Sequence, residues 1–245
     1  MALHFITPDA TSAQPGSSVL LTGAEAKHAA VVRRVRLGEP VTLGDGAGVW
    51  LEGEVAAAEP SRVEVRILVR SVEDRPERRI VLVQALAKGD RDELAVQAAC
   101  ELGADEIVPW QASRSVSRWE GAKAAKGRER WATIVREAAK QAHRRWVPEV
   151  VPVESTADLV RRAGEQRVLV LDPSAERRLT ALASDGDDPR DVVLVVGPEG
   201  GVSDEERERL VAAGAECVLL GDTVLRTSTA GPAAIAVLNA ALGRW

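Results

Sequence analysis

The last two thirds of the chain contain short apolar runs that do not alternate with polar residues. These runs are IVLVQAL (Ile80–Leu86), EIVPW (Glu106–Trp110), RVLVLD (Arg167–Asp172), DVVLVVG (Asp191–Gly197) and ECVLLG (Glu216–Gly221). Unbroken apolar runs are typical of strands that are covered on both faces. Helical segments separate them: Gly103 can end one, and the last is expected at Pro232–Leu242. Strands that alternate with helices predict a mostly parallel α/β sheet.

The first 70 residues have a different pattern and are rich in β-branched residues. Short strands are predicted at Val19–Leu21, Pro40–Leu43, Val49–Ala56 and Arg62–Val69, with a helical stretch at Glu25–Arg34. The sequence GDGAG at Gly44–Gly48 is a turn signal that predicts a hairpin. The charged stretch Ser71–Arg79, after the last of these strands, is broken by Pro76. We therefore predict two domains, 1–72 and 80–245, joined by a linker at 73–79.

Charge is distributed unevenly along the 245 residues. The formal net charge is −5, which excludes a chain that is basic throughout. Ser113–Trp146 nevertheless holds ten Lys/Arg and three Asp/Glu, a local net charge of +7, so the remainder carries −12. Lys27–Arg36 also contains no acid. Such runs are often only solvated faces, but two of them in an acidic chain suggest a polyanionic partner.

Several classes of protein are disfavoured by what the sequence lacks. Cys100 and Cys217 have no metal or redox spacing, and the three histidines lie far apart, so no metal site is predicted. The N-terminus MALHFITPDA has no signal-peptide pattern. No apolar run approaches the ~18 residues of a membrane span. A cytoplasmic protein without a membrane partner is expected.

A glycine-rich turn follows a buried strand in VVLVVGPEGGVSDEE, residues 192–206. Such a turn can be purely steric, but it also lets a ligand approach the backbone. Neither a Walker lysine nor a G-x-G-x-x-G fingerprint is present. Ser203 and Glu206 form a predicted capping box, and acids fill the first turn of the helix. Because a phosphate would meet several carboxylates, the loop favours a neutral or cationic ligand.

A second loop of this kind lies within Cys217–Leu242, where a strand breaks at Gly221 and small polar residues precede an Ala-rich helix. Arg226 is the lone cation among them. The simpler interpretation is a capped helix with a surface arginine. In open α/β sheets, however, ligands bind beyond the carboxyl ends of the strands. Three Gly- or Pro-rich strand ends at one such edge predict a binding site there.

These motifs resemble those of a known family. GPEGG after an apolar strand, followed by LRTSTA before the final helix, is similar to the RsmE family of SPOUT-class RNA methyltransferases, which use S-adenosylmethionine. Further matching positions, in chain order, are His28, Val32, Arg34, Gly38, Asp45, Gly46, Lys88, Glu101–Gly103, Arg114–Val116, Glu137, Ala138, Gln141, Arg144, Val147 and Pro148. Ser228 stands where the family usually has glutamate, so a glutamate there cannot be an indispensable base in this chain.

The resemblance implies both a fold and an activity. The expected fold is a C-terminal α/β SPOUT domain with a parallel sheet and a trefoil knot, plus an N-terminal PUA-like β-barrel that helps to hold RNA. The expected reaction is methylation of N3 of uridine 1498 in the 16S rRNA of the small ribosomal subunit, by a homodimer. S-adenosylmethionine carries a sulfonium and no phosphate, in agreement with the acidic glycine loop.

Three sets of site residues are predicted with this resemblance. The cofactor pocket is expected to comprise Leu171, Asp172, Gly197, Glu199, Gly200, Leu220, Gly221, Leu225, Arg226, Thr227 and Thr229. RNA contacts are expected from His28, Arg33, Arg34, Arg114, Gln141, Arg144 and Arg145. As catalytic residues, Arg226 is expected to stabilise the anion that develops on uracil, and Glu199 to orient the cofactor or take the proton.

Two other functions remain open from the sequence. One is another SPOUT chemistry, such as ribose 2′-O methylation. The other is a non-catalytic RNA-binding factor in ribosome assembly, although such a factor would be expected to have a damaged GPEGG loop. A nicotinamide-dependent oxidoreductase is disfavoured by the missing dinucleotide fingerprint.

Overall fold

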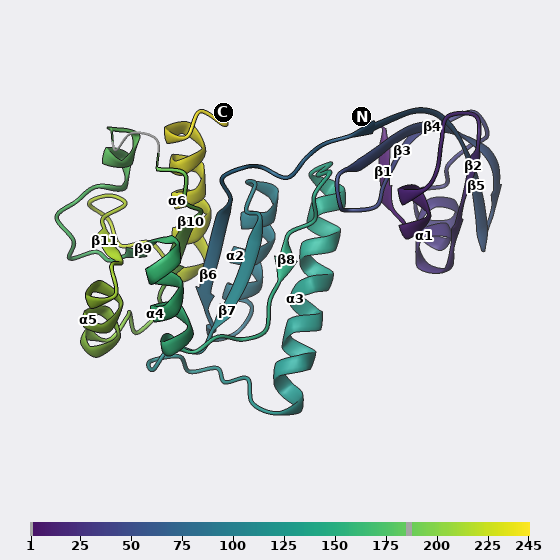
Figure 1. The fold of residues 1–245 in the computed structure, drawn as a ribbon. Coiled ribbons are helices and arrows are strands. Elements are labelled where there is room, and N and C mark those ends of the chain that lie inside the picture. The colour runs from purple at the N-terminus through teal and green to yellow at the C-terminus, as the bar shows by residue number, and fades with distance from the viewer. Residues whose placement is uncertain (1, 185–187) are drawn as a thin grey trace. The chain divides into compact units, whose positions relative to one another are not determined.

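The computed structural model describes residues 2–184 and 188–245, which fall into two compact units (Figure 1). The first unit comprises Met1–Arg75 and Ala139–Val147; the second comprises Pro76–Ala138 and Pro148–Trp245. The boundary after Arg75 lies inside the predicted linker, 73–79. The predicted division into 1–72 and 80–245 is corrected at 139–147, which belongs to the first unit. Backbone hydrogen bonds explain this, since the N–H of Val147 donates to the carbonyl of Gly46 (2.9 Å).

The first unit is built on a five-stranded mixed sheet of order β1-β3-β4-β5-β2. Its strands are β1 (Leu3–Ile6), β2 (Ser18–Thr22), β3 (Pro40–Gly44), β4 (Val49–Glu59) and β5 (Arg62–Val72). β3 and β4 pair in antiparallel fashion on either side of the GDGAG turn, which confirms the predicted hairpin. Gly46 and Gly48 adopt left-handed φ values of 75° and 104°, which explains why this turn uses glycine.

Burial alternates along the strands of this unit. In β4, Val49, Leu51 and Val55 are buried while Glu52 is exposed, the pattern of a strand with one solvent-facing side. Three short helical elements accompany the sheet: η1 (Pro8–Thr11), α1 (Gly23–Lys27) and η2 (His28–Val32). The predicted helix at Glu25–Arg34 therefore ends two residues early. Arg34 adopts a left-handed φ of 55°, which a helix cannot contain.

The second unit contains a six-stranded parallel sheet of order β11-β9-β10-β6-β7-β8. Its strands are β6 (Ile80–Ala85), β7 (Glu106–Trp110), β8 (Glu149–Val150), β9 (Arg167–Leu171), β10 (Val192–Val196) and β11 (Glu216–Val218). Every residue of β6, β7 and β10 is buried, as expected for strands covered on both faces. The predicted α/β class with a parallel sheet is confirmed.

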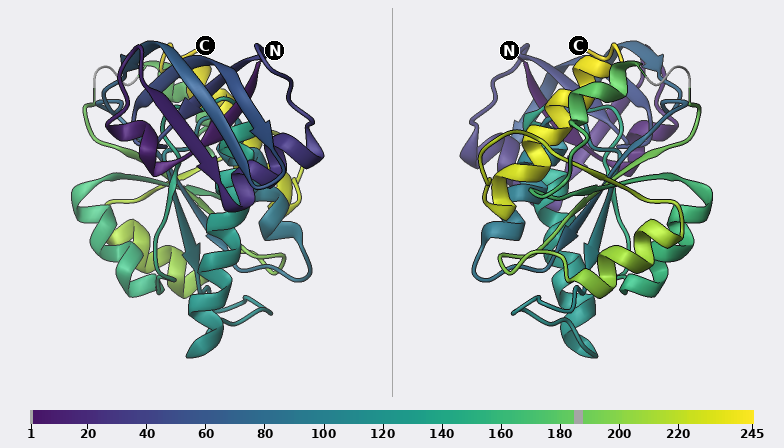
Figure 2. Two further views of the ribbon diagram at one scale, coloured as in Figure 1. Left: turned by 90° about the vertical axis from the view of Figure 1, so that its right-hand side faces the viewer. Right: turned by 90° about the vertical axis from the view of Figure 1, so that its left-hand side faces the viewer.

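Helices cover both faces of this sheet (Figure 2). They are α2 (Arg91–Glu101), α3 (Ala122–Gln141), α4 (Thr156–Glu165), α5 (Asp204–Ala212) and α6 (Thr227–Ala241). Leu159 of α4 and Leu210 of α5 join the core on one face. On the other face, a Cβ at Gly231 of α6 would lie only 2.9 Å from the side chain of Leu82. α6 begins five residues before the predicted Pro232–Leu242.

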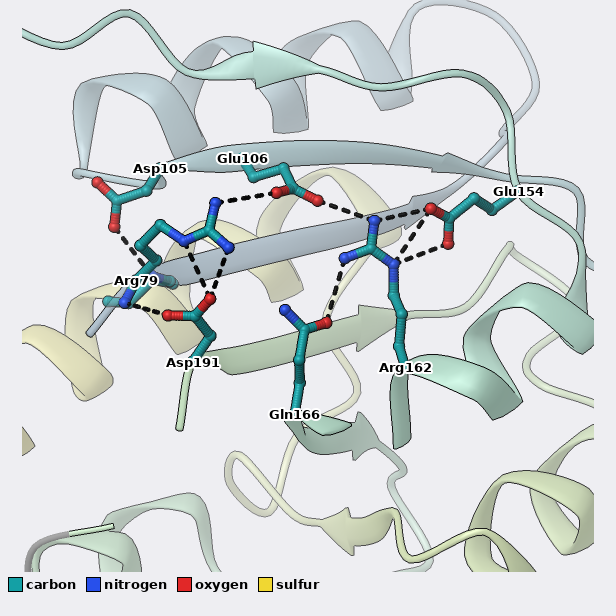
Figure 3. A network of polar contacts seen from close by, with 8 residues as sticks. Arg79, Asp105, Glu106, Glu154, Arg162, Gln166 and Asp191 are labelled. Carbon is teal, nitrogen blue, oxygen red and sulfur yellow. Dashed lines mark hydrogen bonds and ion pairs between the residues drawn. The ribbon is translucent and has the colours of Figure 1, made fainter. Parts of the chain in front are cut away.

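The amino edge of the same sheet is closed by a network of ion pairs (Figure 3). Arg79, just before β6, donates to Asp191 (2.7 Å) and to Glu106 (3.3 Å). Arg162 of α4 donates to Glu106 (2.8 Å) and to Glu154 (2.7 Å). Glu106 thus links the two arginines, and each guanidinium is bound by at least two carboxylates.

Candidate active site

A pocket of about 420 Å³ opens at the carboxyl edge of the sheet in the second unit. Its walls are the segments that follow β9, β10 and β11, together with the starts of α2 and α6. Leu171 and Val196, the last residues of β9 and β10, form part of its lining. This is the edge at which open α/β sheets hold their ligands.

Most of the predicted cofactor residues line this one pocket. They are Leu171, Asp172, Gly197, Glu199, Leu220, Gly221, Leu225, Arg226 and Thr227. Segments that are far apart in the sequence meet here because the sheet order places β9 between β10 and β11. The convergence of the three strand ends, which the sequence predicted, is confirmed.

Gly200 and Thr229 were also predicted to line the pocket, but they do not. The carbonyl of Gly200 accepts a hydrogen bond from Arg114 (3.1 Å). Thr229 is exposed and lies within the first turn of α6. Gly201 lines the pocket instead. Its N–H closes a turn onto the carbonyl of Pro198 (2.8 Å), with a left-handed φ of 72° that requires glycine.

Glu199 points its carboxylate at α2 and the segment before it. Its Oε1 accepts hydrogen bonds from the backbone N–H of Lys88 (3.1 Å) and from the guanidinium of Arg91 (3.1 Å). Burial alone would raise the pKa of Glu199, but backbone hydrogen bonds and Arg91 outweigh it and hold the pKa below its ordinary value. The carboxylate is therefore ionised and already engaged, which suits an orienting role better than proton transfer.

Arg226 differs from the other arginines of the pocket. Its guanidinium forms no hydrogen bond or ion pair with any residue that the structure describes. Asp222, the nearest acid in the sequence, is bound instead by Arg178 (2.7 Å). The exposed Arg226 side chain lines the pocket and is available to a ligand.

Thr227, the next residue, is buried and holds the pocket together. Its Oγ1 donates to the carbonyl of Gly197 (2.9 Å) at the end of β10. The same oxygen accepts a hydrogen bond from the side chain of Gln84 in β6 (2.8 Å). The start of α6 is thus tied to two strands of the sheet.

Sequence reasoning missed part of the lining. The additional residues are Arg91, Pro173, Val196, Pro198, Gly201, Val202, Arg207, Leu219, Thr223, Val224 and Ala230. Pro198 and Gly201 belong to the GPEGG motif, and Arg91 opens the helix after β6, so both signals were present. Arg207 carried no local signal, since its partner Asp172 (3.3 Å) lies 35 positions away.

Glu206 connects the glycine loop to the rest of the site. The predicted capping box with Ser203 is confirmed. The buried carboxylate also accepts hydrogen bonds from the N–H of Ser113 (2.8 Å) and from the hydroxyl of Thr156 (2.8 Å). Burial would raise the pKa of Glu206, yet these hydrogen bonds prevail and lower it. Glu206 therefore fixes Ser113 and with it Arg114, whose side chain supports the loop.

Six of the seven predicted RNA contacts lie in the first unit: His28, Arg33, Arg34, Gln141, Arg144 and Arg145. Arg33 and Arg34 are exposed. Arg145 is engaged, because it donates to Ser71 (2.8 Å) and its guanidinium lies 5.4 Å from the ring centroid of Trp50. Arg114, the seventh, lies in the second unit and supports Gly200. Arg114 and Arg145 therefore have structural partners that the sequence did not indicate.

Among residues 2–184 and 188–245, no group of three His, Cys, Asp or Glu side chains could hold a metal ion. No helix among them is long and apolar enough to cross a membrane.

Family profiles match both parts of the chain. The profile described as "RNA methyltransferase domain" matches residues 74–239, and that described as "RNA methyltransferase PUA domain" matches residues 21–68. The predicted SPOUT-class methyltransferase domain and N-terminal PUA-like domain are thereby confirmed. The trefoil knot and the homodimer stay predictions.

Relatives of known name agree with these profiles. "Ribosomal RNA small subunit methyltransferase E" of Mycobacterium bovis is 41% identical over 94% of this chain and 89% of its own length. The protein of that name from Bacillus subtilis is 30% identical over 98% of this chain and 96% of its own length.

Solved structures are similar over nearly the full length. A methyltransferase of Legionella pneumophila with bound S-adenosylmethionine has a TM-score of 0.87 at 32% identity, covering 98% of each chain. The ribosomal RNA small subunit methyltransferase E of Neisseria gonorrhoeae, also bound to S-adenosylmethionine, has a TM-score of 0.84 at 30% identity, covering 98% of each chain. Together with the profile that matches residues 74–239, these likenesses show that the chain belongs to the ribosomal RNA small subunit methyltransferase E family.

Proposed function

We propose that the protein transfers the methyl group of S-adenosylmethionine to N3 of a uridine in the 16S rRNA of the small ribosomal subunit. The observation that carries the N3 assignment is Arg226, a pocket cation with no partner among the residues described. N3 of uracil is flanked by two carbonyl oxygens, which share the negative charge when N3 loses its proton. A guanidinium that donates to one of these oxygens stabilises the charge as it develops and leaves N3 open to the methyl group.

The pocket fits the proposed cofactor. S-adenosylmethionine supplies an electrophilic methyl group on a sulfonium, and its amino acid end carries one charge of each sign. The pocket likewise presents both signs: Glu199 is paired with Arg91, and Asp172 with Arg207. Because Gly201 has no side chain, a ligand can approach the backbone of this turn closely. This balance of charges extends the sequence argument, which considered only the acids of the loop.

The pocket residues then have distinct roles. Arg226 donates to a uracil carbonyl oxygen beside N3 and favours the deprotonated base, with the N3 proton passing to solvent; N3 then takes the methyl group and leaves S-adenosylhomocysteine. Glu199 keeps the glycine loop in place through Lys88 and Arg91, and its lowered pKa makes it a weak base. Of its two predicted roles, we therefore assign it the orienting one.

RNA binding is assigned mainly to the first unit. Arg33 and Arg34 are exposed on the acid-free segment Lys27–Arg36, where they can contact phosphates. We also propose, from the family likeness, that two copies of the chain form a homodimer and that the second unit is knotted.

Nucleoside mapping tests the reaction directly. Small subunits from a strain that lacks the protein are incubated with the purified protein and S-adenosylmethionine, and the rRNA is then digested and analysed by mass spectrometry. We expect one N3-methyluridine per subunit. The Arg226→Ala protein is the matched control, because the change leaves Glu199 and the glycine loop in place.

The other outcomes are equally informative. A methyl group on a ribose 2′ oxygen would overturn the N3 assignment in favour of the alternative SPOUT chemistry. Absence of transfer by a protein that binds S-adenosylmethionine in calorimetry would overturn the catalytic function and favour an RNA-binding factor.

A further inference from the structure

Gln84 is a polar residue where none is expected. It lies in β6, whose other members are apolar, and its side chain is fully buried. It does not line the pocket, and the proposed function makes no use of it. A buried glutamine must find hydrogen-bond partners or lower the stability of the fold.

The partners of Gln84 fix the direction of every hydrogen bond around it. The carbonyl of Gly197 can only accept, so the hydroxyl of Thr227 must donate its one proton there (2.9 Å). The hydroxyl is then left as an acceptor, and Gln84 must present its NH₂ group to it (2.8 Å). The same NH₂ group also donates to the backbone carbonyl of Ala85 (3.2 Å). The result is a directed chain from β6 through the start of α6 to the glycine loop.

This arrangement leaves one polar atom of Gln84 unsatisfied within the described part of the chain, which lowers the stability of the fold. The Oε1 atom of Gln84 is buried and has no hydrogen-bond partner among the residues described. An unsatisfied buried acceptor lowers stability, and methionine, which has a similar length, would avoid that penalty. The reason for a glutamine at this position therefore lies outside the stability of the core.

The position of Thr227 next to Arg226 gives a reason for a glutamine at position 84. Thr227 directly follows Arg226, which caps α6 with an extended backbone (φ −66°, ψ 152°). The Arg226 side chain has no partner among the residues described. The position of its guanidinium is therefore restricted only by the backbone of Arg226. Whatever anchors Thr227 therefore limits where Arg226 can reach.

We propose that Gln84 is a positioning residue for the methyl-transfer step, acting through Thr227 on Arg226. The inference rests on the proposed function, in which Arg226 binds the uracil. Gln84 touches neither cofactor nor RNA; it restricts the first turn of α6 so that the Arg226 guanidinium is placed before the uridine arrives.

The Gln84→Met variant tests the proposal in single-turnover methyl transfer. The rate should fall about 10- to 100-fold, the range expected when a catalytic group is held less firmly. Affinity for S-adenosylmethionine should change much less, because Thr227 still donates to Gly197. Gln97→Met, the same replacement on an exposed residue of α2, is the control and should leave both unchanged.

A double-mutant comparison separates positioning from packing. Thr227→Val keeps the shape and removes the hydroxyl, so it should slow transfer more than Thr227→Ser, which keeps the hydroxyl. If Gln84 positions Arg226 through that hydroxyl, Gln84→Met combined with Thr227→Val should be no slower than Thr227→Val alone, because the bond to Ala85 stays within β6 and does not reach α6. Rate losses that multiply in the double variant, or that simply follow the melting temperature, would overturn the proposal.

Hydrogen exchange provides a test that does not depend on the RNA substrate. In Gln84→Met, the backbone amides of the first turn of α6 should exchange faster than in the wild type, while those of α4 should not change. Unchanged exchange in α6 would overturn the positioning role. Faster exchange together with a wild type that does not methylate uridine would instead contradict the proposed function alone.

Discussion

The two edges of the parallel sheet use the same kinds of charged residue for opposite purposes. At the amino edge, Arg79 and Arg162 are each bound by two carboxylates and share Glu106 (Figure 3). At the carboxyl edge, Arg226 has no partner among the residues described, and the loops around it form a pocket. Charge is neutralised internally at one edge and left for a ligand at the other.

This difference shows how an arginine can be interpreted from its surroundings. A guanidinium that carboxylates already satisfy adds rigidity and has few donors left for a substrate. A guanidinium that lines a pocket with no acid in reach keeps its donors available to a ligand. Arg91 and Arg207 are intermediate cases, since they line the pocket but are paired with Glu199 and Asp172.

The largest expected effect comes from removing the unpartnered arginine. Arg226→Ala should lower the single-turnover rate of methyl transfer by about 100- to 1000-fold, as loss of one preorganised donor typically does. Arg226→Lys should recover little, because an ammonium cannot reproduce the planar fork. Calorimetry should show nearly unchanged affinity for S-adenosylmethionine, and the melting temperature should hold. Near-normal turnover by the alanine variant would remove the main contrast between the two edges.

At the amino edge, the corresponding change should affect stability and not chemistry. Arg162→Met leaves Glu106 and Glu154 without their shared cation in a largely buried setting. We expect the free energy of unfolding to fall by about 2–3 kcal/mol, somewhat less than for fully buried pairs. Urea unfolding measures this, and the transfer rate well below the melting temperature should not change.

Arg161→Met is the matched control for that experiment. Arg161 is the neighbouring arginine of α4, is mostly exposed and, among the residues described, pairs only with Asp158. Exposed pairs contribute about 0–1 kcal/mol, so its loss should hardly be measurable. If Arg162→Met slowed methyl transfer while the fold stayed intact, the amino edge would not be purely structural.

Much of the second unit could be predicted from the sequence for a physical reason. Strands buried on both faces must be apolar throughout, so β6, β9 and β10 were apparent as unbroken runs, and parallel topology brings their carboxyl ends together. The segment 139–147 could not be assigned in this way. It begins within α3, and contacts with distant residues place it in the first unit: backbone hydrogen bonds at Gly46 and Gly48, and the hydrogen bond from Arg145 to Ser71.

The site was predictable where local sequence encodes it and not where partners come from distant segments. GPEGG and Arg226 are local signals, and both lie at the pocket. Gln84 was not recognised because its partner, Thr227, is 143 positions away. Arg145 was assigned to RNA because nothing in the sequence indicated that Ser71 and Trp50 engage it.

A smaller effect, on the affinity for S-adenosylmethionine, is expected when Gly201 of the pocket lining is replaced. Gly201→Val forces a β-branched residue into a left-handed φ of 72° at a cost of about 1–2 kcal/mol. If the loop rearranges to relieve this strain, affinity for S-adenosylmethionine should fall about tenfold. Gly16→Val is the control, since Gly16 has a similar φ of 88° in the first unit. Equal affinity losses in both variants would indicate a general loss of stability.

The smallest expected effect is the loss of stability when the buried acid Glu206 is replaced. It tests whether the carboxyl edge also contains a purely structural charge. Glu206 is ionised and accepts hydrogen bonds from Ser113, Thr156 and Ser203. In Glu206→Gln one oxygen becomes an NH₂ group that faces donors. The free energy of unfolding at neutral pH should therefore fall by about 1 kcal/mol. Glu205→Gln, in the same helical turn but exposed, should have no such effect.

The pH dependence of this difference follows from the pKa of Glu206, which the hydrogen bonds hold below its ordinary value despite burial. A lowered folded-state pKa contributes stability that is complete above the unfolded value of about 4.3. That contribution is lost as the pH falls through the folded pKa, since protonation removes the acceptor that the donors need. Glutamine does not titrate, so urea unfolding curves of the wild type and Glu206→Gln should differ at neutral pH and converge in acid. A gap that stays constant or widens on acidification would show that the ionised form of Glu206 is not what holds Ser113, and with it Arg114, against the glycine loop.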